Sequence, residues 1–163
     1  MKQIINYIKS LSLILILYSC KDEKNSFQKI PYTGDELRTN GYYFTHYQTL
    51  GRDYTIVNFF FRDGTLLSAG SFESLNFNVV EQKLVERYEL IKKNKIGWGV
   101  FQIIEDKIIS ESWTTNSGGG GLPVYKWSAK IVNDTTFLRN DSNQTWHFKQ
   151  FSPKPDSTNR FIP

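Results

Sequence analysis

The sequence predicts a mainly β protein: an antiparallel meander of eight strands that closes into a small barrel, with one helix inserted between the third and fourth strands. Short runs rich in aromatic and β-branched residues alternate with turn residues along most of the chain. The hydrophobic period changes only once, to helical spacing, after Asn76. A closed barrel of this size removes exposed sheet edges and has room for one small ligand. An open barrel or a sandwich is the alternative architecture.

The first three strands are expected at Gly41–Thr49, Tyr54–Arg62 and Thr65–Ser71. Within the second, Val57, Phe59 and Phe61 share one face and Asn58 lies on the other, since successive side chains of a strand point to opposite sides. The pair Asp63-Gly64 suits a tight hairpin turn because both residue types tolerate positive φ.

A helix is expected from about Asn78 to Lys93. Val80, Leu84, Tyr88 and Ile91 recur at helical spacing and form one apolar face. The opposite face mixes acidic and basic residues, whereas helices that lie on membranes have a basic polar face. We therefore expect this helix to pack on the sheet.

Five further strands are expected at Ile96–Glu105, Lys107–Thr115, Leu122–Val132, Thr135–Arg139 and Gln144–Phe151. Gly97 and Gly99 flank Trp98 in the first of them, where glycine marks either barrel curvature or the close approach of a ligand. The glycines of 118–121 precede a strand rather than a helix, which favours a flexible hairpin loop over a phosphate-binding loop.

The composition argues against nucleic-acid binding. The pI of about 9.1 is basic, but Lys2 and Lys9 lie in an amino-terminal leader and the other basic residues are scattered. A nucleic-acid interface needs them clustered on one face. We expect no nucleic-acid partner.

The amino terminus looks like an export signal. The apolar run 11–18 is shorter than the ~17–25 residues that span a bilayer, but it has the size of a secretory signal core. The residues after it, Leu17-Tyr18-Ser19-Cys20, resemble the lipobox of bacterial lipoproteins. The resemblance implies cleavage before Cys20, a lipid on its sulfur and acylation (for example by palmitate) of its amino group. The alternative is an ordinary signal peptide with an incidental cysteine.

The next residues, Lys21-Asp22-Glu23-Lys24, resemble the tag that directs some lipoproteins to the outer face of the outer membrane, although a solvated linker has the same composition. The expected organisation is a cleaved signal peptide (1–19), a lipidated tether (20–37), a barrel domain (38–151) and an irregular tail (152–163). The membrane is therefore an expected partner through Cys20.

The body of the chain also resembles a known family. An early Gly41-Tyr42-Tyr43, the hairpin of Phe59–Thr65, the inserted helix and the paired later hairpins are similar to lipocalin-like (calycin) lipoproteins over Arg38–Phe151. Tyr43 stands where lipocalins carry a tryptophan. The resemblance implies a barrel that holds a small ligand.

No catalytic constellation is visible. Cys20 is the only cysteine and the chain has two histidines, so a zinc site is not expected, and there is no Gly-x-Ser-x-Gly elbow. We expect neither an enzyme nor a bound cofactor or metal.

The aromatic surplus suggests a lined pocket, and the candidate ligand-binding residues are Tyr43, Trp98, Tyr125 and Trp127. The expected function is a membrane-anchored lipoprotein of the cell envelope that binds a small apolar or glycan ligand. The alternative is a structural or protein-interaction lipoprotein with an envelope protein as its partner and no small ligand.

Overall fold

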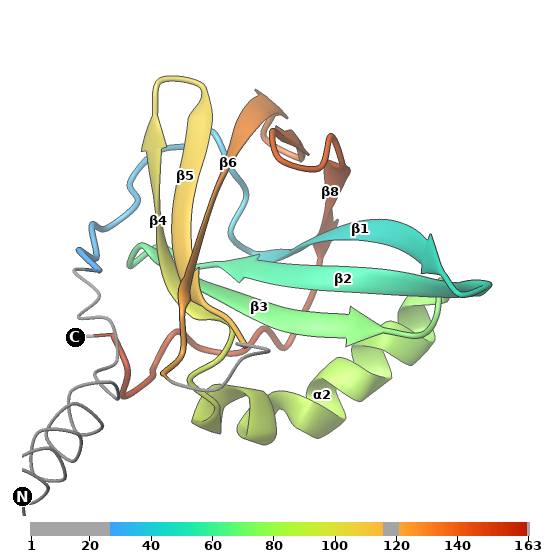
Figure 1. Ribbon diagram of the computed structural model, residues 1–163. Helices are drawn as coiled ribbons and strands as arrows, with labels where there is room; N and C mark the ends of the chain where they lie inside the picture. The colour runs from blue at the N-terminus through green and yellow to red at the C-terminus, as the bar shows by residue number, and fades with distance from the viewer. Residues whose placement is uncertain (1–26, 116–120, 163) are drawn as a thin grey trace, which may run out of the picture.

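The computed structural model describes residues 27–115 and 121–162, which form a closed antiparallel barrel of eight strands (Figure 1). Each strand pairs with its neighbour in sequence, and β8 returns to pair with β1. The elements are β1 (Gly41–Thr49), β2 (Arg52–Phe60), β3 (Thr65–Phe72), α2 (Phe77–Lys93), β4 (Trp98–Ile104), β5 (Lys107–Trp113), β6 (Val124–Asn133), β7 (Thr136–Arg139) and β8 (Thr145–Gln150). The predicted meander and the helix between its third and fourth strands are confirmed.

The two ends of the barrel differ. We call the end with the β2–β3, β4–β5 and β6–β7 turns the closed end, because the segment 32–38 crosses it. There the backbone N–H of Tyr32 donates to the carbonyl of Arg62 at 2.8 Å, and that of Arg38 donates to Asp134 at 3.1 Å. Tyr32 and Leu37 are buried against lumen side chains. The opposite end, with the β1–β2, β5–β6 and β7–β8 connections, is the open end.

Aromatic side chains fill the lumen. Phe60 and Phe101 meet edge to face with their centroids 4.9 Å apart, and Phe137 and Trp146 lie nearly parallel at 5.7 Å. Such pairs contribute about 0.5–1.5 kcal/mol each beyond the area they bury. The lumen is therefore a packed core over most of its depth.

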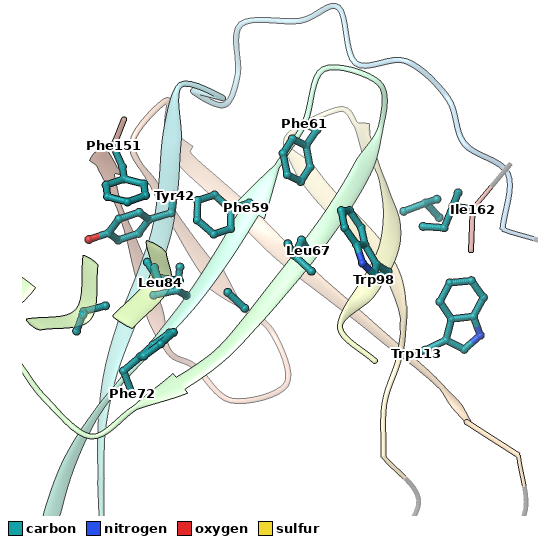
Figure 2. Close-up of a cluster of buried hydrophobic side chains, with 14 residues drawn as sticks. Tyr42, Phe59, Phe61, Leu67, Phe72, Leu84, Trp98, Trp113, Phe151 and Ile162 are labelled. Carbon is teal, nitrogen blue, oxygen red and sulfur yellow. The ribbon is translucent and has the colours of Figure 1, made fainter. Parts of the chain in front are cut away.

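A second core lies outside the barrel wall, where α2 covers the outer face of β1–β3 (Figures 1 and 2). Val80 and Leu84 of α2 are fully buried against it, as the predicted apolar face requires. Asn76 caps the helix, since its side chain accepts from the backbone N–H of Asn78 at 3.0 Å.

Because the wall is covered on both sides, β2 is buried on both faces near its end. Val57 and Phe59 point outward beneath α2, whereas Asn58 and Phe60 point into the lumen. The predicted alternation of side chains along β2 is confirmed. The face with Val57 and Phe59 is the outer face of the barrel wall.

The glycines on either side of Trp98, at the start of β4 and just before it, serve backbone packing. A Cβ on Gly99 would lie 2.1 Å from the carbonyl oxygen of Glu111. A Cβ on Gly97 would lie 2.4 Å from that of Ser68. The sequence left two explanations for these glycines, barrel curvature or the close approach of a ligand. In the structure, what approaches them closely is the backbone of the neighbouring strands β3 and β5.

The carboxyl-terminal tail, residues 151–162, runs back across the outer core. Phe151 and Ile162 are buried there, and Tyr88 of α2 donates from its hydroxyl to the carbonyl of Pro153 at 2.9 Å. Lys154 donates to the carbonyls of Thr39 and Phe60, both at 2.6 Å. Burial lowers the pKa of Lys154 from 10.5 to about 8.

Because of Lys154, the free energy of unfolding should rise with pH in mild alkali. Its amine loses the proton near pH 8 in the folded chain but keeps it to 10.5 when unfolded, so unfolding takes up a proton in this window. The free energy of unfolding should therefore rise by up to about 1.4 kcal/mol per pH unit. Denaturant unfolding between about pH 8 and 9, where unfolded tyrosines are still almost entirely neutral, should show the rise in the native sequence and not in Lys154→Met. An equal rise in both would contradict this role.

Candidate functional site

A cavity of about 200 Å³ occupies the open end of the lumen. It is enclosed by residues from both halves of the barrel wall: Ile56, Asn58, Leu66, Ser68, Gly70, Ile96, Gly97, Ser112, Trp113, Thr114, Tyr125, Trp127, Arg139 and Trp146. Pockets for drug-sized ligands usually measure ~300–1,000 Å³. This cavity therefore suits a small molecule or one end of a larger one.

Strand pairing brings the cavity wall together. Asn58 of β2 lies opposite Ser68 of β3, and Ser112 of β5 lies opposite Tyr125 of β6. Directly paired residues of antiparallel strands point to the same face of the sheet. Both pairs therefore contribute polar atoms on the lumen side of the wall.

Two buried polar atoms in residues that line this cavity have no hydrogen-bond partner. They are Oδ1 of Asn58 and Nε1 of Trp146, in residues that are 4% and 1% exposed. Across residues 27–115 and 121–162 no other buried side-chain nitrogen or oxygen is left unpaired. A buried polar atom without a partner costs about 1–3 kcal/mol. That both cases fall in residues lining one cavity marks it as a functional site.

The cost of the unpaired amide is itself testable. Asn58→Leu should raise the free energy of unfolding of the ligand-free chain by about 1–3 kcal/mol, because an apolar group of similar size removes the unpaired oxygen. Urea unfolding measures this. Asn140→Leu is the matched control: Asn140 is exposed and donates to Ser128 Oγ at 2.8 Å, so its replacement should not stabilise. A marked loss of stability in Asn58→Leu would show that Asn58 has a structural partner.

A stack of three rings lies beside the cavity, and its two outer rings, Trp127 and Trp146, belong to the cavity lining. Phe137 lies nearly parallel to Trp127, with an interplanar angle of 18° and a centroid distance of 6.1 Å, and to Trp146 at 11°. The guanidinium of Arg139 lies 4.7 Å from the centre of the Trp127 ring. The ring of Trp127 thus already has Arg139 and Phe137 as neighbours.

Arg139 is fixed by two partners at the rim. Its Nε donates to Asp141 Oδ1 at 3.0 Å, and its Nη2 donates to the Tyr125 hydroxyl at 2.8 Å and to Asp141 Oδ2. Burial acts to raise the pKa of Asp141, but the hydrogen bonds from Arg139 and Tyr125 outweigh it and lower the pKa. The hydrogen bond to Asp141 and burial raise the pKa of Tyr125. The positive charge at the cavity is therefore compensated.

The structure brings two of the four candidate ligand-binding residues to this cavity, Tyr125 and Trp127. Tyr43 lies in the lumen nearer the closed end, where its hydroxyl donates to the carbonyl of Asp134 at 2.6 Å. Trp98 lies outside the wall: it stacks on Phe61, and its Nε1 donates to the carbonyl of Lys92 at 3.3 Å (Figure 2). Cys20 and residues 116–120 of the glycine loop lie outside the described residues.

Sequence reasoning did not find Asn58, Trp146 or Arg139. The available signal was Asn58, a polar residue inside a run of valine and phenylalanine. Trp146 and Arg139 have no local signal, because only the pairing of β7 with β8 and of β8 with β1 turns them toward Asn58.

Two further features bear on chemistry. No group of three or more His, Cys, Asp or Glu side chains within the described ranges is placed to hold a metal ion. None of the helices in the described part of the chain is long and apolar enough to cross a bilayer.

The fold and the cavity together define a small closed β-barrel with a largely apolar cavity at its open end, whose lining includes a few polar side chains. Comparison of the chain with protein-family models, with curated proteins and with solved structures finds no match.

Proposed function

We propose that this chain is a membrane-anchored lipoprotein of the cell envelope whose barrel binds a small ligand in the open-end cavity. The observation that carries the proposal is that both unpartnered buried atoms, Asn58 Oδ1 and Trp146 Nε1, belong to residues that line one cavity. Buried polar groups normally find partners, and exceptions call for an explanation. A ligand that pairs with them explains why stability is given up at this place.

The anchor is proposed from the residues at the amino terminus. Lipidation of Cys20 would hold the barrel at a membrane, by our proposal the outer membrane, with display on the cell surface as the further step. The first described residue, Phe27, packs edge-on against Trp113 with the ring centroids 4.4 Å apart, and Trp113 lines the cavity. Seven residues span at most about 25 Å, so the open end lies close to the membrane.

Replacement of the anchoring residue should release the protein. In Cys20→Ser cells the chain should leave the detergent-soluble membrane fraction, because two or more acyl chains are needed for stable anchoring. Mass spectrometry of the native protein should find the mature chain beginning at Cys20 with the lipid attached. An unmodified Cys20 in a cleaved chain would contradict the anchor and leave the cavity proposal standing. Protease treatment of intact cells tests surface display, which full protection of the barrel would exclude.

Native mass spectrometry of the full chain, released from detergent micelles, tests the binding function. A bound small molecule should appear as added mass on the native sequence. It should be lost from Ser68→Leu, whose larger side chain fills part of the cavity, and kept in Ser68→Ala, whose side chain does not. Added mass that survives in Ser68→Leu, or none in the native sequence, would contradict the proposal.

A second candidate function is a structural or protein-interaction lipoprotein without a small ligand. The observation that favours it is the exposure of apolar side chains on α2, at Val79, Val85 and Leu90. Contact with a protein partner would remove these apolar side chains from water. Cross-linking in cells through a photoreactive residue at position 85 tests it, and recovery of no envelope protein would count against it.

A further inference from the structure

The residues around the cavity restrict the ligand to one chemical class. We infer that the open-end cavity takes a neutral group with both a hydrogen-bond donor and an acceptor, as in a hydroxyl or an amide, and not an apolar chain or an anion. This inference rests on the proposed binding function and names the ligand class of the same cavity.

The requirement for a donor and an acceptor comes from the two unpartnered atoms. Oδ1 of Asn58 can only accept, and the indole Nε1–H of Trp146 can only donate. An apolar ligand would leave both without partners and would seal them further from water. A ligand with an O–H or N–H and a neighbouring oxygen can satisfy both. Sites with buried polar groups reject analogues that lack the matching group.

The requirement for neutrality comes from Arg139. Of the described residues that line the cavity, it alone is charged, and its guanidinium is held by Asp141 and Tyr125. The side chain of Arg139 is 13% exposed and that of Asp141 is 35% exposed, so the guanidinium charge is already balanced by a carboxylate beside the cavity. An anionic ligand would have to compete with this carboxylate for Arg139 and would be repelled by it. A neutral ligand leaves the pair intact.

The aromatic residues point the same way. Arg139 and Phe137 lie against the Trp127 ring, so less of this ring is left for a ligand to stack on. The apolar wall, which includes Leu66 and Ile56, gives the ligand a packing surface, and the hydrogen bonds select its chemical class.

Four small probes separate the classes: N-acetylglucosamine, which is neutral and carries hydroxyls and an amide; glucose, which carries hydroxyls only; toluene, which is apolar; and benzoate, which is anionic. Each is titrated into the full chain in detergent micelles, and the dissociation constant is taken from the rise in melting temperature. We expect N-acetylglucosamine to bind, with glucose binding equally if the hydroxyl is recognised and more weakly if the amide is. Toluene and benzoate should raise the melting temperature little.

Variants of Asn58 and Trp146 test whether the two unpartnered atoms bind the probe. Asn58→Leu and Trp146→Phe should each weaken N-acetylglucosamine binding by about tenfold or more, the loss expected for one buried hydrogen bond. Trp146→Phe keeps a six-membered ring beside Phe137 and removes the five-membered ring that carries the N–H. The exposed control Asn140→Leu should bind as the native sequence does.

The outcomes are distinguishable. Binding of toluene or benzoate in place of the neutral polar probes overturns the ligand class and leaves the binding cavity standing. Binding of N-acetylglucosamine that Asn58→Leu and Trp146→Phe do not weaken also overturns it. If no probe binds, the ligand class is wrong, and the absence of added mass in native mass spectrometry would then remove the binding function as well.

Discussion

Phe137→Ala should lower the free energy of unfolding by about 3–5 kcal/mol, the range for truncation of a buried phenylalanine. Phe137 is completely buried at the centre of the lumen, and its ring lies between 5.2 and 6.1 Å, centre to centre, from those of Tyr43, Phe60, Trp127 and Trp146. Its removal leaves a void that these rigid rings cannot close. It also weakens β7, which is only four residues long.

Equilibrium unfolding in urea measures this effect, with Leu50→Ala as the control. Leu50 lies at the β1–β2 turn and is 96% exposed, so its truncation should change the free energy by no more than about 0.5 kcal/mol. A loss of less than about 1 kcal/mol in Phe137→Ala would show that the lumen is not the packed core described above.

Gly97→Ala should be comparably destabilising, for two reasons that can be separated. Gly97 has φ +91°, where a side chain costs about 1–3 kcal/mol. Its Cβ would also lie 2.4 Å from the carbonyl oxygen of Ser68, to which strand β3 gives little freedom. Forcing an extra carbon into packed structure adds about 1–3 kcal/mol.

Gly70 provides a matched control, because its φ is also +91° but a Cβ there would meet nothing within 4 Å. Gly70→Ala should therefore show only the backbone cost, and the difference between the two variants isolates the contact with Ser68. Because Ser68 and Gly97 both line the cavity, Gly97→Ala should also weaken ligand binding. Equal destabilisation by the two variants would contradict the close approach of the two strands.

The elements of the fold could be predicted because their signals are local. Turn residues such as Asp63-Gly64 and the alternation within each strand place the strands, and the change of period places α2 to within one residue of its start at Phe77. The strand β2 begins earlier than expected, at Arg52, because Thr49 pairs with Arg52 across the hairpin.

The site could be predicted only in part, because the lumen and the outer core have similar composition. Both are aromatic, so alternation does not reveal that Trp98 faces outward and Trp127 inward. Trp146 and Asn58 come together only through the closure of β8 on β1, which joins residues far apart in the chain. The residues Leu17–Cys20 that resemble a lipobox are also a local signal, and lipidation of Cys20 stays a prediction.

The central claim is that the open-end cavity binds its ligand through Asn58 and Trp146, and the indole signals of the tryptophans test it most directly. A ¹H–¹⁵N spectrum of the full chain labelled at tryptophan should contain four indole N–H signals. On addition of N-acetylglucosamine, the Trp146 signal should shift as its N–H gains an acceptor. The Trp98 signal should stay in place, since that N–H already donates to the carbonyl of Lys92. A Trp146 signal that stays unchanged while the probe is bound would contradict the account.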